Sequence, residues 1–151
     1  LRNIDGKRFE DATAQAGSQF ATPIVGRGLA VGDINNDGRP EVVTVDCFGG
    51  VHIYANEHPA SGAWVGLKLI GTTSARDGSG AIITVKTGEK TFVRHAHTDG
   101  SYMSASDGRV LVGLGSTVGQ VDITVRWPSG RTQQLKAQTP GSYITVTEGT
   151  N

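Results

Sequence analysis

Short runs of apolar and β-branched residues, separated by turn sequences that contain glycine, recur along the whole chain. The sequence has 22 glycines among 151 residues, and Asp-Gly, Thr-Gly-Glu and Pro-Ser-Gly turns separate many of the runs. Runs of this length are typical of strands joined by tight turns. The sequence therefore predicts an all-β fold, and only residues 10–16 have mild helical propensity. The expected strands cover residues 27–31, 41–46, 51–55, 64–70, 81–87, 90–97, 109–113, 120–127, 132–137 and 142–147.

A polar connector at residues 56–63 divides the chain, and we predict two domains, at residues 1–58 and 64–149. The second domain alternates regularly: Ile83 and Val85 are separated by Thr84 and followed by Lys86. A period of two places one set of side chains on a buried face and the other on a wetter face. We therefore expect the second domain to be an antiparallel β-sandwich.

An oxygen-rich loop, residues 33–41 (DINNDGRPE), lies between two apolar runs that are predicted to be strands. A hard cation such as Ca²⁺ takes about 6 to 8 oxygen ligands, and Gly38 supplies the sharp turn that such a loop needs. The loop is a nine-residue relative of the EF-hand loop, held by strands rather than helices. The predicted Ca²⁺ ligands are the side chains of Asp33, Asn35, Asp37 and Glu41 and the backbone carbonyl of Arg39.

The alternative for this loop is a simple hairpin turn without an ion. A turn uses Asp37 and Gly38 but has no use for Asp33 and Glu41. Three acidic groups within nine residues repel one another unless a cation neutralises them. The pattern therefore favours a Ca²⁺ site over an empty turn.

Composition narrows the classes of partner. Lys plus Arg and Asp plus Glu both number 14, and no basic stripe interleaved with aromatic residues is present, so we expect no nucleic-acid partner. Cys47 is the single cysteine, which excludes an intramolecular disulfide and a cysteine-based zinc site. The sequence contains no run of about 18 apolar residues, so it predicts no membrane-spanning helix. Because residue 1 is leucine, we expect a processed or excised chain, and a lost secretion signal stays open.

Two other groups of polar residues resemble metal sites. His95 and His97 are two apart on a predicted strand and would share a face, which suits Zn²⁺ or Cu²⁺ if a third ligand approached. A solvated strand face is the preferred interpretation, because no cysteine or acidic partner lies nearby in sequence. Asp77, Asp99 and Asp107 each precede glycine, so turns are preferred over a second Ca²⁺ site.

The chain contains no pattern that predicts catalysis. Serines, a histidine and an aspartate occur close together in residues 97–106, but the sequence has no Gly-x-Ser-x-Gly nucleophile elbow, and a triad is defined by geometry. We expect no enzymatic activity. Three aromatic residues could form a carbohydrate platform, although a core role is preferred. The residues concerned are Ser101, Ser104, Ser106, His97 and Asp99 for the triad, and Trp64, Tyr102 and Trp127 for the platform.

Two parts of the chain resemble known families. Residues 28–56 resemble an FG-GAP or VCBS repeat, the calcium-loop unit of integrin-type β-propellers, and residues 1–17 resemble the linker and outer strand before such a repeat. From residue 64 onward the chain resembles the ASPIC/UnbV domain, found at the C-terminus of cartilage acidic protein and its bacterial homologues. The segments that carry the second resemblance are 64–69 (WVGLKL), 80–85 (GAIITV), 100–106 (GSYMSAS), 112–115 (VGLG) and 125–131 (VRWPSGR).

The first resemblance implies a partial propeller-blade-like hairpin unit at residues 1–58. It also carries the five loop ligands over to this chain. Glu41 stands where the family loop usually has Asp, and its longer side chain is able to bind bidentately, as the final Glu of an EF-hand does. One repeat cannot close a propeller, so its sheet edges are expected to pair with something, and self-association is one hypothesis.

Together the resemblances imply a calcium-binding, non-enzymatic structural or adhesion module that is extracellular or on the cell surface. Its partner would be a protein, a glycan or another copy of the chain. The alternative is an accessory domain of a biosynthetic or surface enzyme system that binds a small molecule or glycan. A convergent pocket with perturbed acids would favour the alternative. The calcium-binding structural module is the preferred interpretation, because the strongest chemical pattern in the sequence is a set of oxygen ligands.

Overall fold

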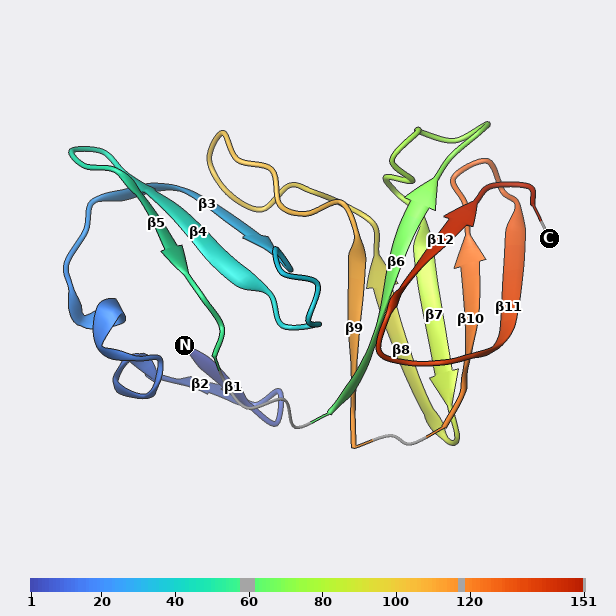
Figure 1. Ribbon diagram of the computed structural model, residues 1–151, viewed down its shortest axis with the longest axis horizontal. Helices are drawn as coiled ribbons and strands as arrows, with labels where there is room; N and C mark the ends of the chain where they lie inside the picture. Colours follow the sequence, from blue (N-terminus) through green and yellow to red (C-terminus); the bar gives the residue numbers. More distant parts are fainter. Residues whose placement is uncertain (58–61, 117–118, 151) are drawn as a thin grey trace.

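The computed structural model describes residues 1–57, 62–116 and 119–150 and is all-β (Figure 1). Neither short 3₁₀ helix in the described part of the chain is long and apolar enough to cross a membrane. The strands are β1 (Arg2–Ile4), β2 (Arg8–Glu10), β3 (Gly26–Gly32), β4 (Glu41–Asp46), β5 (Val51–Tyr54), β6 (Ala63–Ile70), β7 (Ile82–Thr87), β8 (Lys90–His95), β9 (Val110–Gly115), β10 (Val121–Arg126), β11 (Thr132–Gln138) and β12 (Tyr143–Thr147); the 3₁₀ helices are η1 (Thr13–Gln15) and η2 (Ser18–Ala21).

The second half of the chain is a sandwich of two sheets. One sheet has the order β11-β10-β7-β8 and is antiparallel throughout. The other has the order β12-β6-β9, in which β9 is antiparallel to β6 but β12 is parallel to it. The predicted β-sandwich is therefore confirmed, with one parallel pair that the sequence analysis did not anticipate.

The core lies between these two sheets. The alternation read from the sequence sets the buried face: Ile83 and Val85 are fully buried, whereas Lys86 is exposed. Trp127, directly after β10, is also buried, which confirms its core role over a carbohydrate-binding role. Apolar residues from both sheets complete one cluster, namely Val65, Leu67, Leu69, Ala81, Ala96, Val110, Val112, Leu114, Val121, Ile123, Val125 and Val146.

Glu148, directly after β12, is buried and fastens the loop that follows β6. Its Oε2 accepts hydrogen bonds from the backbone N–H groups of Thr72, Thr73 and Ser74 at 2.9, 2.8 and 2.8 Å. Its Oε1 accepts from the hydroxyls of Ser74 and Ser129. Burial by itself raises the pKa of Glu148, but these hydrogen bonds outweigh it and hold the pKa well below its usual range.

The first half of the chain is built around a three-stranded antiparallel sheet in the order β3-β4-β5. A separate hairpin joins β1 to β2, and the ring of Phe20 in η2 packs 4.7 Å from the ring of Tyr54 in β5. Several apolar side chains of the three-stranded sheet remain exposed, among them Leu29, Val45, Val51 and Ile53. This half therefore buries much less apolar surface than the sandwich does.

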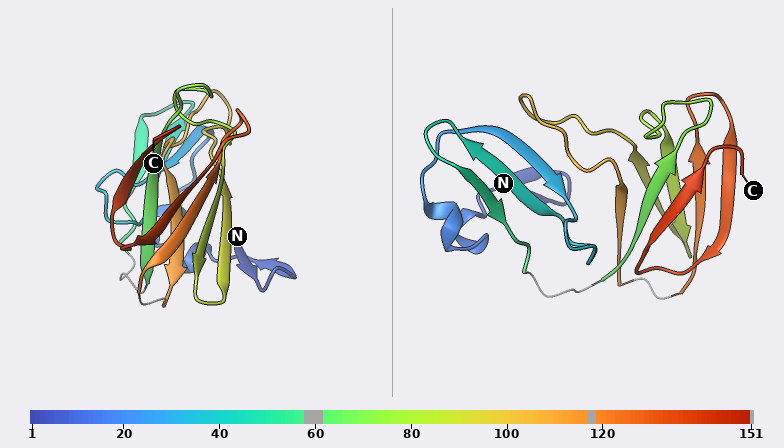
Figure 2. Two further views of the ribbon diagram at one scale, coloured as in Figure 1. Left: turned by 90° about the vertical axis from the view of Figure 1, so that its right-hand side faces the viewer. Right: turned by 45° about the horizontal axis from the view of Figure 1, so that its top comes forward.

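The long connection from β8 to β9, residues 96–109, reaches out of the sandwich and lies along β3 (Figure 1 and the right-hand view of Figure 2). The N–H of Asp107 donates to the carbonyl of Val31 at 2.9 Å, and the N–H of Val31 donates to the hydroxyl of Ser106 at 3.2 Å. The guanidinium of Arg27 lies 4.6 Å from the centre of the Tyr102 ring. The connection thereby covers part of the outer edge of β3, one of the sheet edges that a single repeat is expected to pair with something.

The strand predictions agree with the structure to within a few residues, with two differences. The β1–β2 hairpin was not predicted. Residues 10–16 contain the last residue of β2 and the 3₁₀ helix η1, in agreement with the all-β prediction, since seven residues without buried contacts do not hold an α-helix. Strand β8 ends at His95, so His97 does not continue the strand face as predicted. Of the predicted polar connector at 56–63, residues 58–61 lie outside the described residues.

Candidate functional site

The oxygen-rich loop connects β3 to β4 and folds against the sandwich. Gly38 makes the contact possible: its φ is +82°, and a Cβ placed there would lie 2.3 Å from the indole of Trp64 in β6. Only glycine both adopts this backbone conformation without strain and lets the loop approach the ring so closely. The loop is therefore held between its own two strands and the edge of the sandwich.

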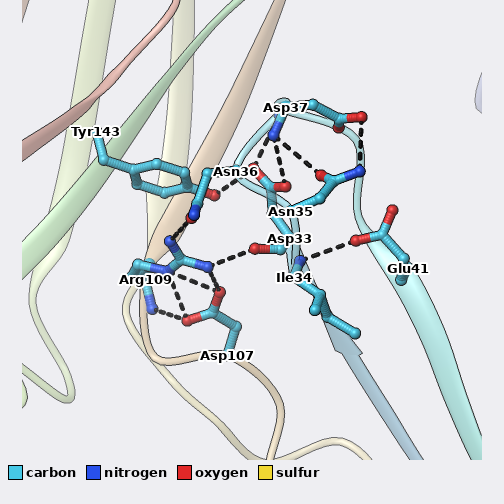
Figure 3. Close-up of polar contacts among 10 residues, drawn as sticks. Asp33, Ile34, Asn35, Asn36, Asp37, Glu41, Asp107, Arg109 and Tyr143 are labelled. Carbon is cyan, nitrogen blue, oxygen red and sulfur yellow. Dashed lines mark hydrogen bonds and ion pairs between the residues drawn. The ribbon is translucent and has the colours of Figure 1, made fainter. Parts of the chain in front are cut away.

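Asp33 is the most buried charged residue of the loop, with 2% of its surface exposed. Its Oδ1 accepts the N–H of Asp37 at 3.0 Å, and its Oδ2 accepts the N–H of Gly38 at 2.9 Å and the hydroxyl of Tyr143 at 2.7 Å (Figure 3). Each carboxylate oxygen has two acceptor positions. Oδ2 is therefore filled by protein donors, whereas Oδ1 retains one acceptor position.

Glu41, the first residue of β4, is 5% exposed. Its Oε2 accepts the N–H of Ile34 at 2.8 Å, which turns the carboxylate into the loop (Figure 3). Its Oε1 is buried and has no hydrogen-bond partner among the described residues. A buried carboxylate oxygen without a partner costs free energy, so Oε1 of Glu41 is an atom of the loop at which an added donor or cation would lower that cost.

Asn35 and Asp37 are nearer to the surface and bond to each other, and Asp37 also bonds to Arg39. The side-chain amide of Asn35 donates to Asp37 Oδ2 at 2.9 Å, and its carbonyl accepts the N–H of Asp37 at 3.1 Å. The guanidinium of Arg39 donates from Nε to Asp37 Oδ2 at 3.0 Å and from its terminal nitrogen to the same oxygen. This contact, above all, holds the pKa of Asp37 below its ordinary value. Arg39 therefore acts as the counter-ion of Asp37.

The predicted ligands thus fall into two sets. The buried carboxylates of Asp33 and Glu41 are both held in the loop by its own backbone N–H groups, whereas that of Asp37 faces Arg39. Accordingly, no three His, Cys, Asp or Glu side chains are placed to share a metal ion anywhere in the described ranges. Of the three acidic side chains predicted as ligands, Asp33 and Glu41 are therefore buried within the loop, whereas Asp37 is paired with an arginine.

Besides Trp64, two residues of the sandwich side, Arg109 and Tyr143, contact the loop. Arg109, just before β9, donates to the carbonyl of Asp33 at 2.6 Å, to the side-chain carbonyl of Asn36, and to both carboxylate oxygens of Asp107. Tyr143, the first residue of β12, lies with its ring 4.2 Å from the Arg109 guanidinium. Figure 3 shows these side chains converging on the loop from the sandwich side.

The charges of this group are mutually stabilised. Burial opposes ionisation of Asp107, but the hydrogen bonds from Arg109 outweigh it and lower the pKa of Asp107, while the pKa of Arg109 is raised by the same partner. Burial, and next the hydrogen bond to the carboxylate of Asp33, raise the pKa of Tyr143 far above its ordinary value. At neutral pH Tyr143 is therefore a hydrogen-bond donor to Asp33.

Sequence reasoning did not identify Arg109, Tyr143 or Trp64 as part of this region. Arg109 and Tyr143 are 76 and 110 residues from Asp33 along the chain. They were assigned only to predicted strands, and no local motif marks them as contacts of the loop. Asp107 is predicted to lie in a turn. Its carboxylate accepts the N–H of Arg109 at 2.9 Å, which is consistent with that prediction.

The other candidate residues lie elsewhere. His97 contacts Asp99 at 2.8 Å, and both side chains are largely exposed. The hydroxyl of Ser104 donates to the carbonyl of Tyr102, and Asp77 accepts the N–H of Ser79 at 3.0 Å, as in an ordinary turn. These contacts are local and satisfied, so they do not compete with the loop as a candidate site.

Comparison with known proteins assigns the sandwich to a family. No curated protein matches the chain. The family described as ASPIC and UnbV matches residues 71–151, from the end of β6 through all the later strands of the sandwich. The match covers more than half of the 151 residues, so the chain belongs to the ASPIC and UnbV family.

Proposed function

We propose that this chain is a calcium-binding, non-enzymatic structural module of the adhesion type, extracellular or on the cell surface. Residues 1–58 are proposed to be an FG-GAP or VCBS type of repeat, as in the cartilage acidic protein homologues, and the oxygen-rich loop is its cation site. The proposed ligands are the side chains of Asp33, Asn35, Asp37 and Glu41 and the carbonyl of Arg39.

The observation that carries the proposal is that Oε1 of Glu41 has no hydrogen-bond partner among the described residues. This oxygen is buried, belongs to an ionisable group, and lies in the same loop as the buried carboxylate of Asp33. Two buried carboxylates in one short loop repel each other unless a cation is present. A divalent cation bound at Oε1 of Glu41 and at the remaining acceptor position of Asp33 Oδ1 would relieve both costs.

The chemistry of the loop suits Ca²⁺ rather than a softer metal. All the proposed ligands are oxygen atoms, and the loop contains no histidine or cysteine. The ion would neutralise the carboxylates and tie the β3–β4 connection together. Asp37 would join the ligands by exchanging its ion pair with Arg39 for the cation.

The adhesion role is supported by the surface of the three-stranded sheet. Val45, Val51 and Ile53 are exposed on β4 and β5, and register places Val45 opposite Val51 on one face. Strand β5 pairs only with β4 in the described sheet, so its outer edge has backbone groups available for another strand. A protein or glycan partner, or another copy of the chain, is proposed to occupy this surface.

The test is the thermal midpoint of the chain in millimolar Ca²⁺ and in excess chelator. A ligand that binds only the folded state stabilises it by about 2.7 kcal/mol at 100 times its Kd. For a chain of this size the midpoint should rise by roughly 5–11 °C. Glu41→Gln should abolish the rise, whereas Glu89→Gln, at the exposed β7–β8 turn, should retain it. An equal midpoint with and without Ca²⁺ in the unaltered chain would reject the calcium site.

A second candidate function, an accessory domain that binds a small molecule, is supported by a cleft on the sandwich. The cleft has a volume of about 500 Å³ and is lined in part by Lys68, Arg76, Asp77 and Arg109. Arg109 is already ion-paired with Asp107, and Asp77 accepts a backbone N–H. Among the described residues, no residue of the cleft lining has a buried side-chain oxygen or nitrogen without a hydrogen-bond partner, whereas Glu41 in the loop has one, and we rank this function second.

A further inference from the structure

Two side chains of the sandwich reach the oxygen-rich loop from separate strands. Tyr143 begins β12 and donates its hydroxyl to Oδ2 of Asp33 at 2.7 Å, while Arg109 precedes β9 and donates to the carbonyl of the same residue at 2.6 Å. The loop belongs to the first half of the chain and both donors belong to the second. The most buried residue of the loop is therefore held from outside its own domain.

The position of the Tyr143 hydroxyl is fixed by packing. The ring lies 5.2 Å from the Trp64 ring and 4.2 Å from the Arg109 guanidinium. It also lies directly over the backbone of β6, since a Cβ at Gly66 would fall 2.2 Å from the ring. An aromatic ring enclosed on several sides points its hydroxyl in one direction. That direction is toward Asp33 (Figure 3).

Arg109 is fixed just as firmly, and it supports the backbone of the loop. Its ion pair with Asp107 orients the guanidinium, which then donates to the Asp33 carbonyl and to the side chain of Asn36. Asn36 has a φ of +62°, a left-handed conformation that asparagine adopts more readily than most residues other than glycine. The hydrogen bond from Arg109 stabilises this residue in the conformation that the loop requires.

These contacts determine which oxygen of Asp33 is available to a ligand. Tyr143 and the N–H of Gly38 fill both acceptor positions of Oδ2, so the remaining position is on Oδ1. Oδ1 accepts only the N–H of Asp37 among the described residues. Without the Tyr143 hydroxyl, the carboxylate of Asp33 would be less strictly oriented.

We propose that Tyr143 and Arg109 are positioning residues of the loop's cation site, so that cation binding and docking of the loop on the sandwich stabilise each other. This inference rests on the proposed calcium function. Linkage is reciprocal: if docking strengthens cation binding by some factor, the cation strengthens docking by the same factor. The ASPIC and UnbV sandwich is thereby part of the cation site, although none of its atoms is a proposed ligand.

The experiment measures the Ca²⁺ dissociation constant by titration calorimetry for the whole chain and for Tyr143→Phe, which removes only the hydroxyl. Loss of a residue that orients a metal ligand weakens metal binding by about 10- to 100-fold, and we expect a loss in this range. Tyr102→Phe is the matched control, because its ring is on the β8–β9 connection and contacts Arg27 rather than the loop. Its dissociation constant should equal that of the unaltered chain.

Amide hydrogen exchange without Ca²⁺ provides the second readout. The N–H groups of Asp37 and Gly38 donate to Asp33, so they should exchange faster in Tyr143→Phe than in Tyr102→Phe. Arg109→Lys, which keeps the charge but loses the paired hydrogen bonds, should show both effects even if Tyr143→Phe folds poorly.

The outcomes separate this inference from the proposed function. An unaltered chain that binds no Ca²⁺ rejects the calcium site and, with it, the coupling. An unaltered chain that binds Ca²⁺ while Tyr143→Phe and Arg109→Lys bind it equally well keeps the proposed function and overturns the inference. Weaker Ca²⁺ binding together with faster amide exchange of Asp37 and Gly38 in either variant supports the inference.

Discussion

Replacing Gly38 by alanine tests whether the oxygen-rich loop packs on the sandwich as the structure shows. The added Cβ would lie 2.3 Å from Cε2 and Nε1 of Trp64, so either the loop or the indole has to move. The φ of +82° adds a second cost, since alanine in a left-handed conformation loses about 1–2 kcal/mol. Displacing a packed ring typically costs about 1–3 kcal/mol more. We therefore expect Gly38→Ala to lower the free energy of unfolding by about 2–5 kcal/mol.

Gly130→Ala is the matched control. Gly130 has a φ of +90°, and no described atom lies within 4 Å of the place where its Cβ would be. This variant should lose only the backbone contribution of about 1–2 kcal/mol. Urea unfolding followed by circular dichroism measures both variants against the unaltered chain. The difference between them, about 1–3 kcal/mol, corresponds to roughly 2–12 °C in the thermal midpoint.

Equal losses in the two variants, to within about 0.5 kcal/mol, would refute the reasoning, because the contact with Trp64 would then contribute nothing. A double variant provides an independent check. If the loss arises from the indole, Gly38→Ala combined with Trp64→Ala should cost less than the sum of the two single variants. Additive costs would mean that the loop and the indole do not touch in solution.

Two further predictions concern charged groups. Arg39→Met should lower the Ca²⁺ concentration at half-saturation, by up to about fivefold, because Arg39 competes with the ion for Asp37; an unchanged titration would contradict this. Glu148→Gln should reduce the loss of stability on acidification. The pKa of Glu148 is lower in the folded than in the unfolded chain, so the ionised carboxylate stabilises the fold. This stabilisation is complete above the unfolded pKa of about 4.3 and is lost as pH falls toward the folded pKa. Thermal midpoints at pH 7 and pH 3 measure this, and parallel decreases in the two proteins would show that Glu148 has no such role.

The sandwich strands were predictable because a local pattern sets which side of a strand is buried. The alternation of Ile83 and Val85 with polar neighbours is a property of consecutive residues, and the structure buries the expected set. The missed β1–β2 hairpin could also have been predicted, because Asp-Gly, here Asp5-Gly6, is a typical hairpin-turn sequence. In the structure both residues have positive φ, as such a turn requires. The parallel pairing of β12 with β6 could not be predicted from the sequence, because the relative direction of two paired strands depends on how the connecting chain crosses the sandwich.

The loop shows the same division. Its composition predicted that oxygen atoms would gather at residues 33–41, and the structure buries Asp33 and Glu41 there. The composition did not predict that Asp37 would turn to Arg39, two residues away. Both partners were visible in sequence, but the choice between a cation and an arginine as the partner of a carboxylate depends on side-chain conformation.

The sequence by itself determined the all-β class, the faces of the sandwich strands and the position of the oxygen-rich loop. Each of these depends on residues that are neighbours along the chain, where spacing decides which side chains share a face or a turn. Only the tertiary structure decided that Arg109 and Tyr143 hold Asp33 from 76 and 110 residues away. Such contacts follow from how sheets and connections pack against one another, and the spacing of residues within one segment carries no information about that packing.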